Sequence, residues 1–342
     1  MDRKKKKQIL ASPIQHIDIT KVNVTSLIDQ MRHMGFSSRE LARATDIYVK
    51  MLQDKNCVIA LTLAGSTSSA GCMNLYADLI KYNMVDVIVA TGASIVDMDF
   101  FEALGFKHYQ GEINANNSML RSLYVDRIYD TYIDEKELQN CDKAIKEIAD
   151  SLESRPYTSR EFIYEMGKYL TKHSKKKISL VELAYKHNVP IFCPAFSDSS
   201  AGFGLVLHQV DRPDKHVTID SVRDFYELTQ IKINAKTTGM VMIGGGTPKN
   251  FWQDTVVCAE VLGKNVPMHK YAVQITVADV RDGACSSSTL KEAQSWGKVD
   301  TAYEQMVYAE ATVALPIMAA YALKKGVWTN ARPRRSLNNM FK

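Results

Sequence analysis

The chain has 342 residues, of which 46% are hydrophobic and 24% charged, so it is long enough to form a globular protein with a full core. Its net charge is +5, but no nucleic-acid-binding motif accompanies the basic runs, which we expect to be solvated ends and loops. No apolar stretch reaches the ~18 residues of a membrane span, and the cysteines show neither metal-ligand spacing nor a disulfide pattern. We therefore expect a cytoplasmic protein without nucleic acid, membrane or metal partners.

The domain organisation is predicted from composition along the chain. Residues 1–15 are predicted to be a flexible basic N-terminal arm, and residues 331–342 a basic C-terminal tail. Between them, residues 16–330 contain no linker, repeat or low-complexity break. We expect these residues to form one domain.

Strands that end in small-residue loops characterise the first half of the chain. The apolar run 57–63 predicts a buried strand, and the loop 65–71 and a helix follow it. Residues 85–90 repeat this layout, with the loop 91–94 and a helix over 95–104. Such loops present N–H groups and hydroxyls that suit a phosphate, although a plain tight connection is the alternative because the dinucleotide glycine fingerprint is absent.

The second half continues the alternation of helices and strands. Residues 111–134 are polar and are expected to be irregular. Helices are predicted at 135–153, 158–172, 179–187, 221–230 and 311–324 and from Thr247–Pro248 onward, and strands at 190–196, 240–243, 271–277 and 305–309.

This alternation predicts an α/β fold. We expect a doubly wound, mostly parallel, Rossmann-like sheet with helices on both faces. The polar loop 197–202 and the glycines at 244–246 also follow strands. Sheets of this kind bind ligands at the carboxyl ends of their strands, so these loops are candidate binding elements.

A short segment near residue 298 combines an amine, an indole and a carboxylate. If residues 291–297 begin an α-helix, Glu292 and Trp296 stand four apart on one face. Such a pair suits an organic cation through charge pairing and cation–π contact. Lys298 follows Gly297, and a lysine against an aromatic wall becomes a usable imine-forming nucleophile. The alternative is a solvated lysine beside a core tryptophan.

The segment Ser295-Trp296-Gly297-Lys298, preceded by Glu292 and the loop 282–286, resembles the deoxyhypusine synthase family near its imine-forming lysine. Residues 244–251 resemble the bacterial deoxyhypusine synthase-like branch in particular. Further blocks that resemble the family occur in family order at 83–87, 91–93, 194–198, 239–246 and 307–311.

The resemblance implies an NAD-dependent transferase. It would move a 4-aminobutyl group from a polyamine such as spermidine through a lysine imine to an acceptor amine. The acceptor would be a lysine of translation initiation factor 5A or a small diamine. The family also implies a homotetramer with sites between subunits. The alternatives are a homospermidine synthase-like enzyme that uses putrescine, a related lysine-imine enzyme with another substrate, and an NAD-binding homologue without turnover.

Residue roles follow from the same resemblance. The catalytic lysine matches Lys298, and the polyamine-binding indole and carboxylate match Trp296 and Glu292. The chain differs from the family at Asp97 and Glu310, where relatives carry glutamate and aspartate. The NAD contacts match Thr67, Ser68, Thr91, Gly92, Asp97, Asp198, Gly245, Ala278, Asp282, Ser286 and Glu310.

Three substrate-pocket positions depart from the family pattern. Phe203 and Cys285 stand where the family has polyamine-binding aspartates, and Asn250 stands where it has a histidine. Each close charge pair that is lost is worth roughly a few kcal/mol, so we expect spermidine to bind weakly or differently.

Overall fold

The computed structural model describes residues 2–21, 23–285 and 288–341. Within these ranges the chain is built around a six-stranded sheet in the order β11-β10-β9-β1-β2-β7, and every neighbouring pair is parallel. The predicted parallel α/β sheet is thus confirmed. Its strands are β1 (Cys57–Leu63), β2 (Val87–Ala90), β7 (Ile191–Phe192), β9 (Thr237–Ile243), β10 (His269–Thr276) and β11 (Val299–Tyr308).

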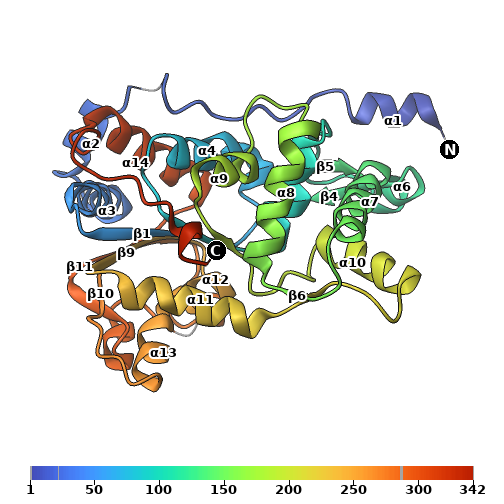
Figure 1. Cartoon of the computed structure of the whole chain (residues 1–342). Helices are drawn as coiled ribbons and strands as arrows, with labels where there is room; N and C mark the ends of the chain where they lie inside the picture. The colour runs from blue at the N-terminus through green and yellow to red at the C-terminus, as the bar shows by residue number, and fades with distance from the viewer. Residues whose placement is uncertain (1, 22, 286–287, 342) are drawn as a thin grey trace.

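Helices cover both faces of this sheet, as predicted (Figure 1). The side chains of β1 alternate between two cores, with Ile59 in one and Val58 in the other. The helices of the first face are α2 (Thr25–Met31), α3 (Phe36–Gln53), α4 (Met73–Lys81), α9 (Leu180–His187) and α14 (Ala311–Lys325). On the second side lie α11 (Ser221–Asn234), α12 (Gly246–Gln253) and α13 (Thr255–Val261).

Residues 111–134 are not irregular, contrary to the prediction. They contain α6 (Asn117–Ser122) and two strands that join β3 (His108–Gln110) in an antiparallel sheet, β4 (Val125–Ile128) and β5 (Thr131–Asp134). The turns at Tyr124 and Tyr129 require positive φ angles of 55° and 52°, which tyrosine rarely adopts, so the sequence gives no turn signal there.

A helix pair beside the small sheet was predicted only in part. Helix α7 (Glu135–Ser151) was expected, whereas α10 (Ser200–Asp211) occupies residues assigned to a loop and beyond. Its glycines permit close packing, because a Cβ on Gly204 would lie 2.6 Å from the backbone oxygen of Asp142. Further elements are α5 (Phe101–Ala103), α8 (Ser159–His173), β6 (Pro156–Tyr157) and β8 (Thr218–Ile219).

The described residues near both chain ends contact the rest of the fold, which corrects the prediction of a flexible arm and a solvated tail. Residues Arg3–Ile9 form helix α1, and Lys6 forms an ion pair with Asp134 at 2.6 Å. Near the other end, the buried Arg332 forms an ion pair with Asp86, which is 1% exposed. A buried carboxylate requires a counter-charge, and the basic end of the chain supplies it. None of the helices in the described ranges is long and apolar enough to cross a membrane.

Candidate functional site

The carboxyl ends of the six parallel strands meet at one edge of the sheet. Strands β2 and β7 follow β1 to one side, and β9, β10 and β11 lie on the other, so the direction of winding reverses between β1 and β9. The loops after these two strands lie close together, since the Ala64 N–H donates to the Ile243 oxygen at 3.0 Å. Gly244 (φ 70°) approaches Ala64 so closely that an added Cβ would lie 3.1 Å from its backbone oxygen. Such a reversal is the usual ligand-binding position of an open α/β sheet.

The predicted cofactor residues lie along this carboxyl edge, and each of the six strands is followed by at least one of them. Ser286 lies outside the described residues. The others are Thr67 and Ser68 after β1, Thr91, Gly92 and Asp97 after β2, Asp198 after β7, Gly245 after β9, Ala278 and Asp282 after β10, and Glu310 after β11.

The polar groups at this edge fit a dinucleotide. The Ser68 hydroxyl is buried, and within the described part of the chain it has no hydrogen-bond partner. Gly92 lets the loop after β2 pack closely against Ser199, because a Cβ at Gly92 would lie 2.5 Å from the Ser199 Oγ. Burial raises the pKa of Asp97 to about 6, and one of its oxygens accepts the Ser200 N–H at 2.6 Å. Among the described side chains, no cluster of three or more His, Cys, Asp or Glu residues is arranged to bind a metal ion.

The segment before Lys298 is a 3-10 helix (Glu292–Trp296), not the α-helix assumed from the sequence. The Thr289 N–H donates to Glu292 Oε2 at 2.7 Å, and the Glu292 N–H donates to Thr289 Oγ1 at 3.2 Å. With three residues per turn, positions four apart point about 120° away from each other, so the predicted shared face of Glu292 and Trp296 is wrong. Gly297 ends the turn at φ 69°.

The Lys298 ammonium lies between an indole and a carboxylate. Its Nζ is 5.0 Å from the ring centroid of Trp296, which confirms the predicted aromatic wall. The same atom is 2.6 Å from Oδ1 of Asp254, and the lysine side chain is only 12% exposed. Asp254 was not identified from the sequence, because it lies 44 residues earlier and belongs to no recognised motif. Trp296 itself is 62% exposed.

Lys298 and the strand-end loops lie at opposite ends of α12. The helix begins at Gly246, beside the cofactor loop, and ends at Gln253, next to Asp254. Its eight residues span about 12 Å. Lys298 directly precedes β11, whereas the cofactor candidate Glu310 follows that strand. Lys298 is therefore separated from Gly245 by the length of α12 and from Glu310 by the length of β11.

A buried lysine, also missed from the sequence, connects α12 to the Lys298 segment. The Lys249 Nζ donates to the backbone oxygens of Cys285 at 2.7 Å and Ser288 at 2.5 Å. Burial lowers the pKa of Lys249 to about 8, and the nearby Lys298 ammonium adds to this effect. Lys249 is 0% exposed, so it anchors the backbone at Cys285 and Ser288 from inside the fold.

The three positions that depart from the family pattern have different environments. Cys285 is 1% exposed and packs in the core with Trp252, so its thiol does not face solvent in the isolated chain. Phe203 is 66% exposed on α10. Asn250 is partly exposed on α12, one turn before Asp254.

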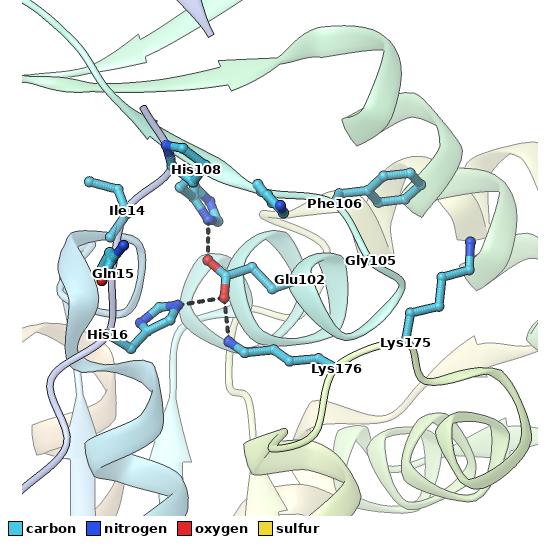
Figure 2. Close-up of a pocket in the computed structure, with 11 residues that line it drawn as sticks. Ile14, Gln15, His16, Glu102, Gly105, Phe106, His108, Lys175 and Lys176 are labelled. Carbon is cyan, nitrogen blue, oxygen red and sulfur yellow. Dashed lines mark hydrogen bonds and ion pairs between the residues drawn. The ribbon is translucent and has the colours of Figure 1, made fainter. Parts of the chain in front are cut away.

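A separate cavity of about 490 Å³ contains none of the predicted site residues. Figure 2 shows His16, His108 and Lys176 converging on Glu102 in its wall. Burial alone would raise the pKa of Glu102, but hydrogen bonds from His108 and His16 hold it well below its usual range. The carboxylate is fully engaged in joining the N-terminal segment to the body of the fold.

The chain resembles deoxyhypusine synthases and their bacterial relatives over most of its length. The family model described as deoxyhypusine synthase matches residues 26–322. The chain is 69% identical to a "Deoxyhypusine synthase-like protein" of Coxiella burnetii, over 97% of this chain and 95% of the relative. It is 41% identical to "Probable deoxyhypusine synthase 2" of Methanosarcina mazei, over 90% and 89%. A solved structure of a candidate deoxyhypusine synthase from Entamoeba histolytica shares the fold, with a TM-score of 0.62, 20% identity, and coverage of 95% and 99%.

Proposed function

The chain belongs to the deoxyhypusine synthase family, and on that premise we propose that it is a cytoplasmic NAD-dependent aminobutyl transferase. It takes a 4-aminobutyl group from a polyamine, holds it as an imine on Lys298 and passes it to an acceptor amine. The observation that carries the proposal is the Lys298 amine, which is nearly buried between Trp296 and a carboxylate. This arrangement combines an amine nucleophile with a wall that attracts organic cations.

The residues of the chain have separate tasks in this reaction. NAD, when bound at the strand-end loops, supplies the hydride acceptor that converts a secondary amine of the polyamine into an imine. Trp296 attracts the cationic chain through its ring face and aligns it along Lys298. Hydrogen bonds from Thr289 lower the pKa of Glu292, so this exposed carboxylate is ionised at neutral pH and suits the distal ammonium. The Lys298 amine then attacks the imine carbon.

We propose that the complete site forms between copies of the chain in a homotetramer. Two observations support this. Lys298 is separated from Gly245 by the length of α12 and from Glu310 by the length of β11, and Trp296 is 62% exposed in one copy. A second copy that covers Trp296 would exclude water from the imine and supply the other half of the site.

A small diamine such as putrescine is the acceptor that we favour. The highly similar relatives from Coxiella burnetii and, at 59% identity, Caulobacter vibrioides carry the name deoxyhypusine synthase-like, which does not specify a protein lysine as the acceptor. A protein lysine of translation initiation factor 5A is the second candidate. The 41% identity to the Methanosarcina protein, whose name specifies deoxyhypusine synthesis, favours that candidate.

Product analysis distinguishes these acceptors. Purified protein is incubated with NAD and spermidine, together with putrescine in one reaction and translation initiation factor 5A in another. Homospermidine identifies the diamine, and deoxyhypusine identifies the protein lysine. Bound NAD without any transferred aminobutyl group, across a panel of polyamines, would refute the transferase and leave a cofactor-binding homologue.

A further inference from the structure

Asp254 lies at the junction of two helices with its carboxylate free of any capping role. Its backbone N–H donates to the Asn250 oxygen at 2.8 Å, and its oxygen accepts from Cys258 at 2.8 Å, so both helices fix its position. The side chain makes no capping hydrogen bond. Within the described residues, its ion-pair partner is Lys298, at 2.6 Å. The fold therefore holds this carboxylate rigidly against one amine.

We propose that Asp254 is a catalytic residue that holds the Lys298 ammonium in the resting protein and carries its proton during imine exchange. The inference rests on the proposed function for the transfer step, but the holding role concerns Lys298 alone. Asp254 is 39% exposed on its side chain, so the carboxylate also remains open to a substrate amine.

The proton balance of imine exchange requires such a group. A lysine ammonium cannot attack, so it first gives a proton to the carboxylate. The resulting amine adds to the carbon of the protonated substrate imine, one proton moves from the lysine nitrogen to the original nitrogen, and the bond from the carbon to that original nitrogen then breaks. The departing amine takes the proton from Asp254 and leaves as an ammonium. Two positive charges are present before and after, and the carboxylate is regenerated.

The other charged groups around Lys298 are less suited to this role. Glu292 is exposed, and its carboxylate already accepts a hydrogen bond from the Thr289 N–H at 2.7 Å. Lys249 is a cation whose hydrogen bonds go to two backbone oxygens. A typical surface ion pair contributes little, but the Lys298 side chain is only 12% exposed and its charge is correspondingly harder to solvate.

Asp254→Asn tests the proposal through two readouts with opposite expected signs. The first is reductive labelling of Lys298 by butanal and cyanoborohydride, mapped by mass spectrometry, which needs neither NAD nor a polyamine. Loss of the carboxylate frees the amine, so labelling at neutral pH should become several-fold to about tenfold faster. The second is polyamine transfer, which should fall on the order of 100-fold or more because the proton carrier is lost. A merely structural defect would not raise the first rate while lowering the second.

Two further variants complete the design. Asp254→Glu keeps a carboxylate and should retain most of the transfer. Glu165→Gln removes a partly exposed carboxylate that pairs with Lys168 at 3.0 Å on α8, and should change neither rate. Unchanged butanal labelling in Asp254→Asn overturns the holding role, and near-parent transfer overturns the proton-carrying role. If the parent protein transfers nothing to any acceptor, the proposed function fails and the proton-carrying role with it, while labelling still decides the holding role.

Discussion

Replacement of Lys249 by methionine should change the pH dependence of stability. Lys249 is 0% exposed, and its ammonium is held by two backbone oxygens without a carboxylate. Burial lowers its pKa from 10.5 to about 8. Between these two values the unfolded chain binds a proton that the folded chain has released. Stability therefore rises with pH across this window, and the cost of the buried charge is fully present below pH 8.

The magnitude follows from the size of the shift. Each pH unit inside the window contributes about 1.4 kcal/mol, so the increment from Lys249 between pH 8 and pH 9.5 is about 2 kcal/mol. Lys249→Met lacks this group and should lack the increment. Burial also lowers the pKa of Lys232 to about 8, but this lysine is present in both proteins and its contribution cancels in the comparison.

Urea unfolding of the parent and Lys249→Met at pH 8.0 and 9.5 measures the increment, with exposed Lys264→Met as the control. The control should behave like the parent. Because Lys249 holds the backbone oxygens of Cys285 and Ser288, the variant should also lose transfer activity by at least tenfold. Identical pH slopes in the parent and Lys249→Met would show that Lys249 is not a buried, proton-releasing group.

Three further predictions concern the cofactor, the substrate and the chain end. NAD should bind with unchanged affinity in calorimetry after chelator treatment, and binding that required a divalent ion would contradict the site. Phe203→Asp should strengthen spermidine binding by adding an exposed carboxylate, whereas Cys285→Asp should instead lower the thermal midpoint because it buries a charge. Arg332→Leu should cost about 3 kcal/mol in urea unfolding, because buried Asp86 keeps only the longer ion pair with Arg335 at 3.6 Å. A loss under 1 kcal/mol would mean that the C-terminal residues are not part of the core.

The sheet could be predicted from sequence because its signals are local. Short apolar runs end in glycine and serine loops, so the strands and the loops after them could be predicted from sequence. The cofactor candidates on these loops come from the family resemblance and stay a prediction. By contrast, α10 contains Gly202 and Gly204, which weaken any helix signal. Gly204 permits close contact with α7, which is a tertiary property, and Gly202 packs against the backbone of Ser197.

Contacts in the candidate site could be predicted between residues close in sequence, but not between residues far apart in sequence. Trp296 and Lys298 are two residues apart, and their contact followed from that proximity. Asp254 and Lys249 reach the same segment from α12, and no spacing rule connects residues so far apart in sequence. The buried pair of Asp86 and Arg332 was missed for the same reason, so a basic run was interpreted as a solvated tail.

Borohydride trapping tests the central claim most directly. During turnover with NAD and spermidine, reduction should attach one aminobutyl group to Lys298 in the parent protein, located by peptide mass spectrometry. Lys298→Arg retains the positive charge but cannot form an imine, so it should give neither adduct nor transfer while NAD binding stays nearly intact. An adduct on a different lysine, or near-parent transfer by Lys298→Arg, would contradict the assignment of Lys298 as the residue that carries the aminobutyl group.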